Sequence, residues 1–569
     1  MHPEKFSLST ADYVIFAAML VLSSCFGVFF QLTEKKKTHE EYLLGGKDMS
    51  LLPVALSLMA TFMSATTLMG IPAEMYLYGT NMTFMNLGFI LGPIITSFVF
   101  LPIFFANGIS TAYEYLEIRF GKATRKLVSA MFAFQSILFT AATLYAPALA
   151  LSAVTDLSLW MSIISIGLVC TFYCTLGGIK AVVWADVFQA VLMYTCLIAI
   201  IIKGCLLLGG IGNVFDIANE GGRLVLPSFS FDLGAHYTMF NIFAQGMIIT
   251  MSSFAGMQCQ VQRLLSVKNV KRSITASLLS IPMIVGFQLL CCLCGLIFYA
   301  YFKSCDPMTS ADSPIQSADQ LLPYFIASTL SDLPGLPGLC ICGIFSASLS
   351  TISSSINSLA SVASEDFVRP LYPKFTVLHT KILSVVFGLL CIAVSFLVSS
   401  LGHLVKMSVI IVGMLAGPNL AVFLLAACTT ATNQEGIILG ILASLVIAAC
   451  LSFIPENKTD PFLPLSNECP LPDSNGTSIL YTPPNSNTSS YLSTTTTSAE
   501  IVEGGSFHIS YMWISSLALI ACLVVGYFSS ILISFCQEES KEVPEMHLSA
   551  VRTWFSSKKP KEKALNLAG

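Results

Sequence analysis

The chain has 569 residues, of which 55% are apolar and 11% are charged, and its formal net charge is −4. Soluble globular proteins carry about 25% charged residues. This composition therefore argues against a soluble enzyme, a disordered scaffold and a nucleic-acid binder, which would need a basic patch. The apolar residues come in runs of about twenty, the length that a helix needs to cross ~30 Å of hydrocarbon. We expect an all-α polytopic membrane protein.

Thirteen apolar runs predict transmembrane spans, at residues 12–32, 51–77, 83–105, 127–153, 158–177, 184–208, 237–256, 274–302, 336–363, 377–398, 405–428, 435–454 and 511–535. The first run is too long for a signal peptide, and no A-x-A cleavage site follows it. Lys35, Lys36 and Lys37 come directly after it. We expect residues 1–32 to hold a retained extra helix whose N-terminus lies outside.

The distribution of positive charge tests this orientation, because cytoplasmic loops carry an excess of Lys and Arg. With the N-terminus outside, 22 of the 28 Lys and Arg residues fall on the inner side. The basic tail at 536–569 is then cytoplasmic, which requires an odd number of spans. The predicted location is the cell membrane.

The long segment at 455–510 then faces outward. It is rich in Pro, Ser, Thr and Asn, a composition typical of disorder. It contains three sequons, which predict glycosylation at Asn457, Asn475 and Asn487. Cys305 and Cys469 are the only cysteines in predicted outer loops, so a disulfide between them and two free thiols remain alternatives.

Two spans break the apolar pattern. The second carries Thr61, Ser64, Gly70 and Pro72 among other helix-weakening residues, and a broken helix persists in a membrane only where it lines a protein cavity. The ninth holds seven hydroxyl side chains within residues 346–357. Small-residue helix packing is the alternative explanation. A hard cation such as sodium prefers several oxygen ligands, from carbonyls and hydroxyls. A broken helix beside a hydroxyl-rich helix supplies both kinds.

Asp186 is the most unusual ionisable residue, because it lies in the first turn of the sixth span. An ionisable group at membrane depth is a candidate functional residue. A carboxylate that balances the dipole at the start of a helix is an equal alternative.

The order of the spans indicates two repeats of opposite orientation. Spans 2–6, at 51–208, and spans 7–11, at 237–428, are two groups of five, so the second group runs in the opposite sense. Broken span 2 then corresponds to span 7, which has its own interruption at 246–256. Interrupted segments in matching positions mark the binding site of secondary transporters. The spans at 435–454 and 511–535 are peripheral.

At these positions the sequence resembles the sodium/solute symporter family, which contains sodium-coupled sugar, iodide, multivitamin and monocarboxylate carriers. The resemblance covers roughly residues 10–455 and the final span. It is carried by segments at 62–65, 110–117, 145–149, 170–184, 260–263, 305–307, 333–338 and 349–355. Sugar carriers of this family usually have a fourteenth span, so the thirteen predicted here favour the iodide, multivitamin and monocarboxylate subgroup.

The resemblance implies a sodium site and a substrate site. Sodium would be bound by the carbonyls of Ala60, Met63 and Ala347 and by the side chains of Ser350, Thr351, Asp186 and Gln189. The implied substrate contacts are Phe62, Ser64, Thr67, Thr250 and Phe254. Monocarboxylate carriers have Thr at the position of Thr67, whereas the iodide carrier has Gln there.

The resemblance therefore implies a symporter that couples sodium to a small monocarboxylate, such as lactate, a short-chain fatty acid or nicotinate, by alternating access. A carrier for iodide or another anion, or for a vitamin such as biotin or pantothenate, is the alternative within the family, and a channel is a remote one. No enzyme motif is present. The expected partners are sodium as coupling ion, a small organic anion and the lipid bilayer, with no other cofactor and no nucleic acid. The sequence does not indicate the oligomeric state.

Overall fold

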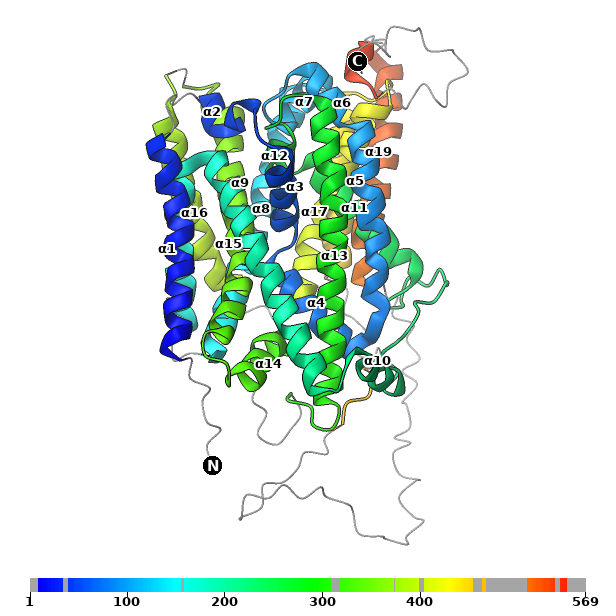
Figure 1. Ribbon diagram of the computed structural model, residues 1–569. Helices are drawn as coiled ribbons and strands as arrows, with labels where there is room; N and C mark the ends of the chain where they lie inside the picture. Colours follow the sequence, from blue (N-terminus) through cyan, green and yellow to red (C-terminus); the bar gives the residue numbers. More distant parts are fainter. Residues whose placement is uncertain are drawn as a thin grey trace, which may run out of the picture.

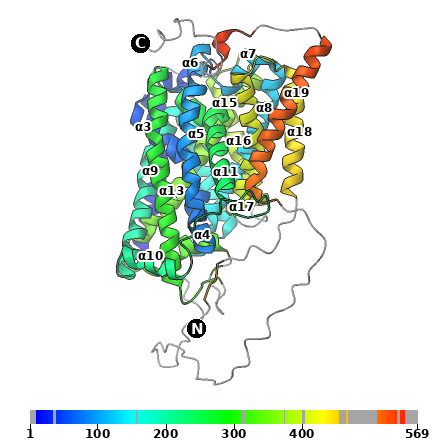
Figure 2. The ribbon, with the colours of Figure 1, turned by 90° about the vertical axis from the view of Figure 1, so that its right-hand side faces the viewer.

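The computed structural model describes residues 9–33, 39–154, 158–308, 315, 317–372, 374–398, 404–453, 463–466, 509–537 and 543–549. Within these ranges the regular structure is helical, apart from one isolated bridge between Ser228 and Thr238. The prediction of an all-α protein is confirmed. Figures 1 and 2 show the long helices running side by side between the two ends of a bundle.

The α-helices are α1 (Thr10–Thr33), α2 (His39–Leu44), α3 (Leu51–Phe62), α4 (Ala65–Tyr78), α5 (Met85–Val99), α6 (Leu101–Asn107), α7 (Ala112–Arg119), α8 (Lys122–Val154), α9 (Leu159–Leu207), α10 (Ile211–Glu220), α11 (Met239–Gly256), α12 (Gln258–Leu264), α13 (Val270–Phe302), α14 (Leu321–Leu330), α15 (Leu336–Val362), α16 (Val377–Val398), α17 (Leu404–Cys428), α18 (Gln434–Ser452) and α19 (Ile514–Gln537). Short 3₁₀ or π turns are η1 (Gly45–Lys47), η2 (Gly79–Phe84), η3 (Ala318–Gln320), η4 (Ala363–Val368), η5 (Tyr511–Trp513) and η6 (Glu545–His547).

Ten helical stretches of the described chain are long and apolar enough to cross a membrane. One of them, α9, holds the two predicted spans 158–177 and 184–208. Its 49 residues are interrupted at Gly178, where φ is 57°. A straight helix of that length would measure about 74 Å, more than twice the ~30 Å of hydrocarbon. Gly178 therefore separates two crossings, and the count of thirteen spans stays a prediction.

Two predicted spans are each divided into two helices by a break in the backbone. α3 ends at Phe62 and α4 begins at Ala65, and the two residues between them have extended backbone. This break confirms the interruption predicted in the second span. α11 ends at Gly256 and α12 begins at Gln258. The second break thus lies just beyond the predicted stretch 246–256, through which α11 is continuous.

α15 is the most deeply buried long helix, with 25 of its 27 residues buried. Several of its serines bond carbonyls of the same helix: Ser354 and Ser353 both donate to the carbonyl of Ser350, at 2.5 and 3.1 Å. Such back-bonding lets hydroxyl side chains lie inside an apolar bundle at little cost.

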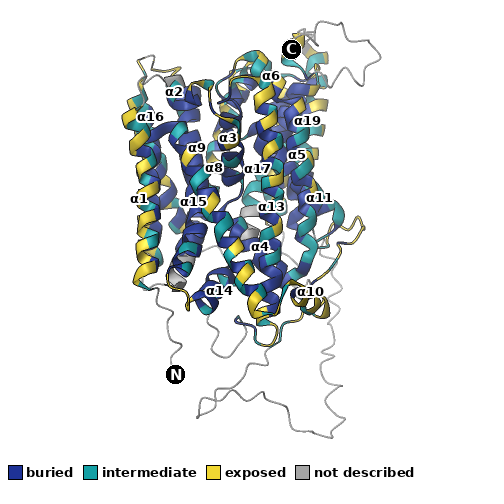
Figure 3. Ribbon diagram, in the orientation of Figure 1, coloured by how far each residue is buried: buried dark blue, intermediate teal, exposed yellow. Residues whose placement is uncertain are grey.

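Helices at the rim of the bundle are exposed instead. Only 17% of the residues in the apolar stretch of α1 are buried, and Figure 3 shows exposed residues along its length. An exposed apolar face of this length suits contact with lipid.

One end of the bundle is held together by a buried arginine. The Arg223 guanidinium donates to the carbonyls of Tyr76, Gly221, Leu463 and Pro464, at 3.0 to 3.2 Å. These bonds join the end of α4 to the segment 463–466. At the same end, Asp12 of α1 accepts hydrogen bonds from two backbone N–H groups around the start of α15.

The opposite end carries an ion-pair cluster. Arg125 at the start of α8 contacts Asp366 of η4 at 2.5 Å and Glu117 of α7 at 2.6 Å. Burial raises the pKa of Glu114. The hydrogen bond from the Ser110 backbone N–H and the positive charge of Arg125 act in the opposite direction and lower this pKa. The cluster joins α7, α8 and the end of α15.

The crossing of α5 and α11 supplies a test of the packing. A Cβ added at Gly88 would lie 2.3 Å from the backbone nitrogen of Met247, a contact that cannot be relieved by moving a side chain. Overpacking of this kind costs about 1–3 kcal/mol. We expect Gly88→Ala to lower the unfolding temperature of the purified protein. Gly286→Ala on α13 is the matched control, because nothing lies within 4 Å of its Cβ position. Equal unfolding temperatures in the two variants would contradict this account of the crossing.

Candidate functional site

A cavity of about 150 Å³ lies where the two broken helices meet their neighbours. Its wall is built from the α3–α4 break, η2, α5, α8, α11, α12, α13, α15 and α17. The lining residues are Thr61, Phe62, Met63, Ser64, Thr66, Thr67, Ile71, Met82, Met85, Phe89, Gln135, Ser136, Phe139, Ile249, Ser252, Ser253, Met257, Cys259, Gln260, Gln288, Thr351, Ser355, Val412 and Ala416. No Lys, Arg, His, Asp or Glu is among them.

Three of the five predicted substrate contacts lie in this wall: Phe62, Ser64 and Thr67. Thr250 and Phe254 do not. The Thr250 hydroxyl instead donates to the carbonyls of Gly246 and Gly88, at 2.6 and 3.1 Å, and so joins α11 to α5. Phe254 is fully buried and packs edge-on against Phe62, with ring centroids 6.2 Å apart. The structure therefore places both behind the wall.

The predicted sodium ligands of α3 and α15 are brought together beside the cavity. The Ser350 hydroxyl donates to the Ala60 carbonyl at 2.5 Å, in the last turn before the α3–α4 break. The Thr351 hydroxyl donates to the Ala347 carbonyl at 3.2 Å and lies 3.5 Å from the Thr61 carbonyl. Thr351 and Met63 also line the cavity. Carbonyl and hydroxyl oxygens from two helices thus converge, the donor set that suits a hard cation.

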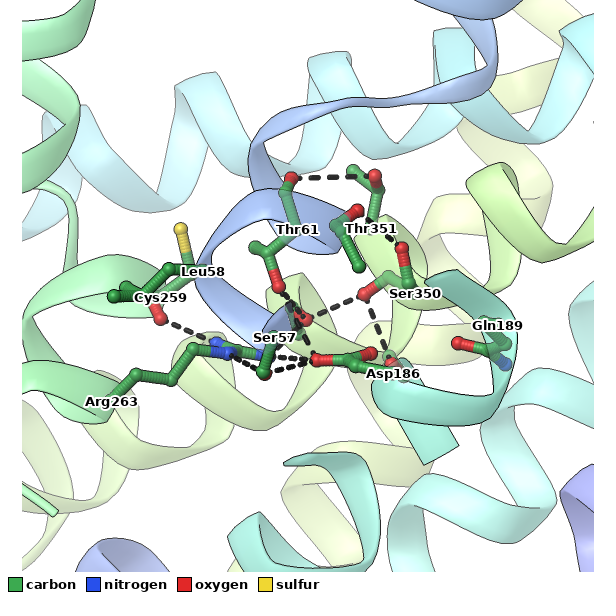
Figure 4. A network of polar contacts seen from close by, with 12 residues as sticks. Ser57, Leu58, Thr61, Asp186, Gln189, Cys259, Arg263, Ser350 and Thr351 are labelled. Carbon is green, nitrogen blue, oxygen red and sulfur yellow. Dashed lines mark hydrogen bonds and ion pairs between the residues drawn. The ribbon is translucent and has the colours of Figure 1, made fainter. Parts of the chain in front are cut away.

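Asp186 is fully buried on α9, one turn from Gln189. Its Oδ2 accepts hydrogen bonds from Ser57 at 2.5 Å and from the Arg263 guanidinium at 2.9 Å. Figure 4 shows Arg263 reaching from α12 into this group of side chains, with Ser57 and Thr61 on the intervening helix α3. The carboxylate therefore has a protein cation as partner, which neither alternative of the sequence analysis anticipated.

The Arg263 guanidinium makes further contacts in the same group. Its Nε donates to Ser57 at 2.6 Å, and its terminal nitrogens bond the Cys259 carbonyl and the Ser354 hydroxyl. Thr61 lies between the Asp186 group and the Ser350–Ala60 group. Its hydroxyl is 3.0 Å from the Ser354 hydroxyl and 3.4 Å from Oδ2 of Asp186. The Asp186 group and the Ser350–Ala60 group are therefore one continuous polar network across α3, α9, α12 and α15.

Among the described residues, Oδ1 of Asp186 and Oε1 of nearby Gln189 on the same helix have no hydrogen-bond partner. The amide nitrogen of Gln189 is engaged, because it donates to the Tyr173 hydroxyl at 3.5 Å. A buried oxygen without a partner is costly unless a cation or water satisfies it. Both residues therefore fit the cation-ligand role that the resemblance implies.

Arg263, Ser57 and Ser354 were missed by the sequence analysis as members of a site. Arg263 stands in one of the segments that carry the family resemblance, at 260–263, and a buried arginine needs an acidic or carbonyl partner. That was the only signal available. The predicted disulfide and glycosylation sites lie away from this network in the sequence. Cys305 is disulfide-bonded. Cys469, Asn457, Asn475 and Asn487 lie outside the described residues, so the Cys305–Cys469 pairing and the three glycans stay predictions.

Comparison with known proteins places the chain among sodium-coupled transporters. The sequence profile described as "Sodium:solute symporter family" matches residues 42–444. The chain is 36% identical to sodium-coupled monocarboxylate transporter 2 of Mus musculus, over 98% of this chain and 89% of that protein. It is 38% identical to the sodium-dependent multivitamin transporter of Oryctolagus cuniculus, over 78% of this chain and 70% of that protein.

Among solved structures, a Na⁺-coupled sialic acid symporter in a substrate-bound outward-open state has the same fold. Its TM-score is 0.74 at 22% identity, and the match covers 92% of this chain and 98% of that one. The profile match over most of the chain and the relatives above 30% identity lead to one conclusion. The chain belongs to the sodium:solute symporter family, a family of membrane transporters in which sodium is the coupling ion.

Proposed function

We propose that this protein carries small monocarboxylates, such as lactate, short-chain fatty acids or nicotinate, across the cell membrane together with sodium by alternating access. The observation that carries the proposal is the position of Thr351. Its side chain lines an uncharged cavity and at the same time joins the oxygen cluster of Ala60, Ala347 and Ser350. An ion in that cluster would lie beside a substrate in the cavity.

The sodium site is proposed at the carbonyls of Ala60, Met63 and Ala347 and the hydroxyls of Ser350 and Thr351. The Ser350 hydroxyl bonds the Ala60 carbonyl at 2.5 Å, and an ion would exchange this hydrogen bond for direct contact with both oxygens. Asp186 and Gln189 are proposed as further sodium ligands on the strength of their unpartnered oxygens. In that case the Arg263 guanidinium and the ion would share the Asp186 carboxylate.

The substrate site is proposed at the start of α4. Ser64 is the residue before the first helical turn, and Thr66 and Thr67 follow within it. The N-terminus of a helix carries a partial positive charge and free N–H groups, which favour an anion. Phe62, Met85, Phe89 and other apolar residues form the rest of the wall. A carboxylate with a short apolar body suits both halves.

The size of the cavity favours a small substrate over a vitamin. At about 150 Å³ it lies below the roughly 300–1,000 Å³ typical of pockets for drug-sized ligands. Lactate and butyrate are far smaller than biotin or pantothenate. The alternatives are transport of a vitamin or iodide and channel-like flux, and the uptake experiment below distinguishes them from monocarboxylate transport.

The sodium gradient supplies the driving force. One sodium ion and one monocarboxylate together carry no net charge, so only the concentration gradient acts on such a pair, at ~1.4 kcal/mol per tenfold ratio. Each further sodium ion adds that amount and ~2.3 kcal/mol per 100 mV of membrane potential. The number of occupied sodium sites therefore decides whether the cycle is electrogenic.

Sodium-dependent uptake of lactate, butyrate, nicotinate, iodide and biotin tests the substrate class. We expect saturable uptake of the carboxylates that concentrates them inside the cell and disappears when choline replaces sodium. Uptake of iodide or biotin without any of the small carboxylates would overturn the assignment. Flux that does not saturate and never exceeds equilibrium would indicate a channel.

Thr351→Ala tests the proposed sodium site. A hydrogen bond to a charged group is worth ~1.5–3 kcal/mol, so loss of one hydroxyl ligand should raise the sodium concentration for half-maximal transport about tenfold to hundredfold. The substrate KM at saturating sodium should change less, since the substrate feels the loss only through linkage.

Ser348→Ala is the matched control for Thr351→Ala. Ser348 is also fully buried on α15, but its hydroxyl donates to the Thr143 carbonyl of α8 at 2.5 Å and does not line the cavity. Its sodium dependence should stay normal. Normal sodium dependence in Thr351→Ala together with a loss in Ser348→Ala would show that the wrong face of α15 was assigned.

We also propose that the N-terminus and the segment 455–510 lie outside the cell and that the tail at 536–569 is cytoplasmic. Asn457, Asn475 or Asn487 should then carry glycan, so glycosidase should increase the gel mobility of the protein. A C-terminal tag should be labelled only after the cells are permeabilised. Unchanged mobility together with labelling of the tag on intact cells would reverse the orientation.

A further inference from the structure

Within the described part of the chain, three glutamine side chains in the cavity wall have polar atoms without a hydrogen-bond partner. They are Gln135 of α8, Gln260 of α12 and Gln288 of α13, and each is at most 3% exposed. The unpartnered atoms are Nε2 of Gln135, Oε1 of Gln260 and both ends of the Gln288 amide. A buried amide without a partner is costly, so each of these groups calls for a ligand or an ordered water.

The three glutamines are not equivalent. Gln260 has a structural task, because its amide nitrogen donates to the Leu58 carbonyl of α3 at 3.2 Å. That bond uses one of its two N–H groups and fixes the amide on α3, and its unpartnered atom is the oxygen, which would repel a carboxylate. Gln288 makes no hydrogen bond to the described chain through either end of its amide, and the amide nitrogen of Gln135 makes none either. These two side chains therefore have donors to offer.

The chemistry of the cavity indicates what these donors would meet. A carboxylate accepts hydrogen bonds through two oxygens and donates none. No Lys, Arg or His is among the described residues that line the cavity, so a carboxylate bound among them must find neutral donors. Each glutamine amide supplies two N–H groups at no charge, and hydroxyls such as Ser136, next to Gln135 in the wall, add rotatable donors.

We propose that Gln288 and Gln135 are specificity-determining residues that hold the carboxylate of the transported anion through their amide N–H groups. This inference rests on the proposed function. Neutral donors orient a carboxylate but do not cancel its charge. Binding of the anion is then weak until sodium occupies the adjacent oxygen cluster, and this order couples the two solutes without a fixed positive residue in the cavity.

Amide donors in the cavity should make the carrier selective for an acid over its amide. In the wild type, donors face the acid group, so a carboxylate such as butyrate should bind better than its neutral amide, butyramide. In Gln288→Glu, assayed at a pH at which the introduced carboxyl is ionised, an acceptor replaces the amide. It repels butyrate and accepts hydrogen bonds from butyramide. Gln288→Leu removes the donors without adding charge and should also narrow the preference for butyrate, which loss of a residue that acts only in packing would not do.

Three variants test the proposal in cells, with the amount of protein at the surface measured for each. Gln288→Leu and Gln135→Leu should raise the KM for butyrate at saturating sodium by about tenfold or more, the worth of a hydrogen bond to a charged group. The sodium dependence at saturating butyrate should move less. Gln288→Glu should lower the ratio by which butyrate outcompetes butyramide as an inhibitor of uptake.

Gln245→Leu is the matched control. Gln245 of α11 is also fully buried and also has an unpartnered amide nitrogen, but it does not line the cavity. Its oxygen accepts a hydrogen bond from Ser515 of α19. This variant should keep the wild-type KM for butyrate. A rise equal to that of Gln288→Leu would show that loss of any buried glutamine disturbs the bundle, and would overturn the proposal.

Thermal unfolding of the purified proteins supplies a readout that does not depend on transport. Removal of an unpaired buried amide should leave substrate-free Gln288→Leu at least as stable as the wild type. The rise in unfolding temperature on adding butyrate with sodium should be smaller in the variant, because a ligand stabilises in proportion to its affinity. If Gln288→Leu does not reach the surface, Gln135→Leu and Gln288→Glu decide the question.

The outcomes separate this inference from the proposed function. Absence of sodium-dependent butyrate uptake in the wild type would overturn both. Normal wild-type uptake with unchanged KM in Gln288→Leu and Gln135→Leu, and unchanged selectivity in Gln288→Glu, would overturn the inference alone.

Discussion

The structure depends on one constraint, that every polar backbone group freed by a broken helix inside a membrane must find a partner within the protein. The break between α3 and α4 frees carbonyls in the last turn of α3, and hydroxyl groups of α15 lie against these carbonyls. Ser350 donates to the Ala60 carbonyl, and Thr351 lies beside that of Thr61. The groups that make the break tolerable are the same oxygens that suit a cation. The residues that stabilise the break are therefore the ones proposed to bind sodium.

The pair of Asp186 and Arg263 shows how the fold carries charge through its centre. Both side chains are at most 1% exposed. Removal of one partner from such a pair costs about 3–5 kcal/mol, because the other charge is then left buried and alone. Ser57 and Ser354 complete the set by bonding the guanidinium. The pair ties α12, beyond the second helix break, to α9, and it leaves the neighbouring cavity free of charged side chains.

An uncharged cavity has a consequence for coupling. A buried carboxylate facing only hydroxyls, amides and a helix N-terminus is incompletely stabilised, because hydrogen bonds offset only part of the cost of removing an anion from water. A cation in the adjacent oxygen cluster, the proposed sodium site, would supply the remainder at short range, where the low dielectric strengthens the attraction. A fixed arginine in the wall would bind the anion without sodium and would weaken the dependence of one solute on the other.

The helices and the first break could be predicted from local sequence, since apolar runs of span length and clustered hydroxyls, glycine and proline act over neighbouring residues. The family motifs located Ser350 and Thr351 near Ala60. Side-chain partners required the tertiary structure. Arg263 meets Asp186 across 77 positions, Thr250 points to α5 and away from the cavity, and Gln135 and Gln288 reach one wall from α8 and α13. Each of these contacts depends on the rotation and depth of helices far apart in the chain, and hydropathy patterns carry no information about which faces of such helices meet.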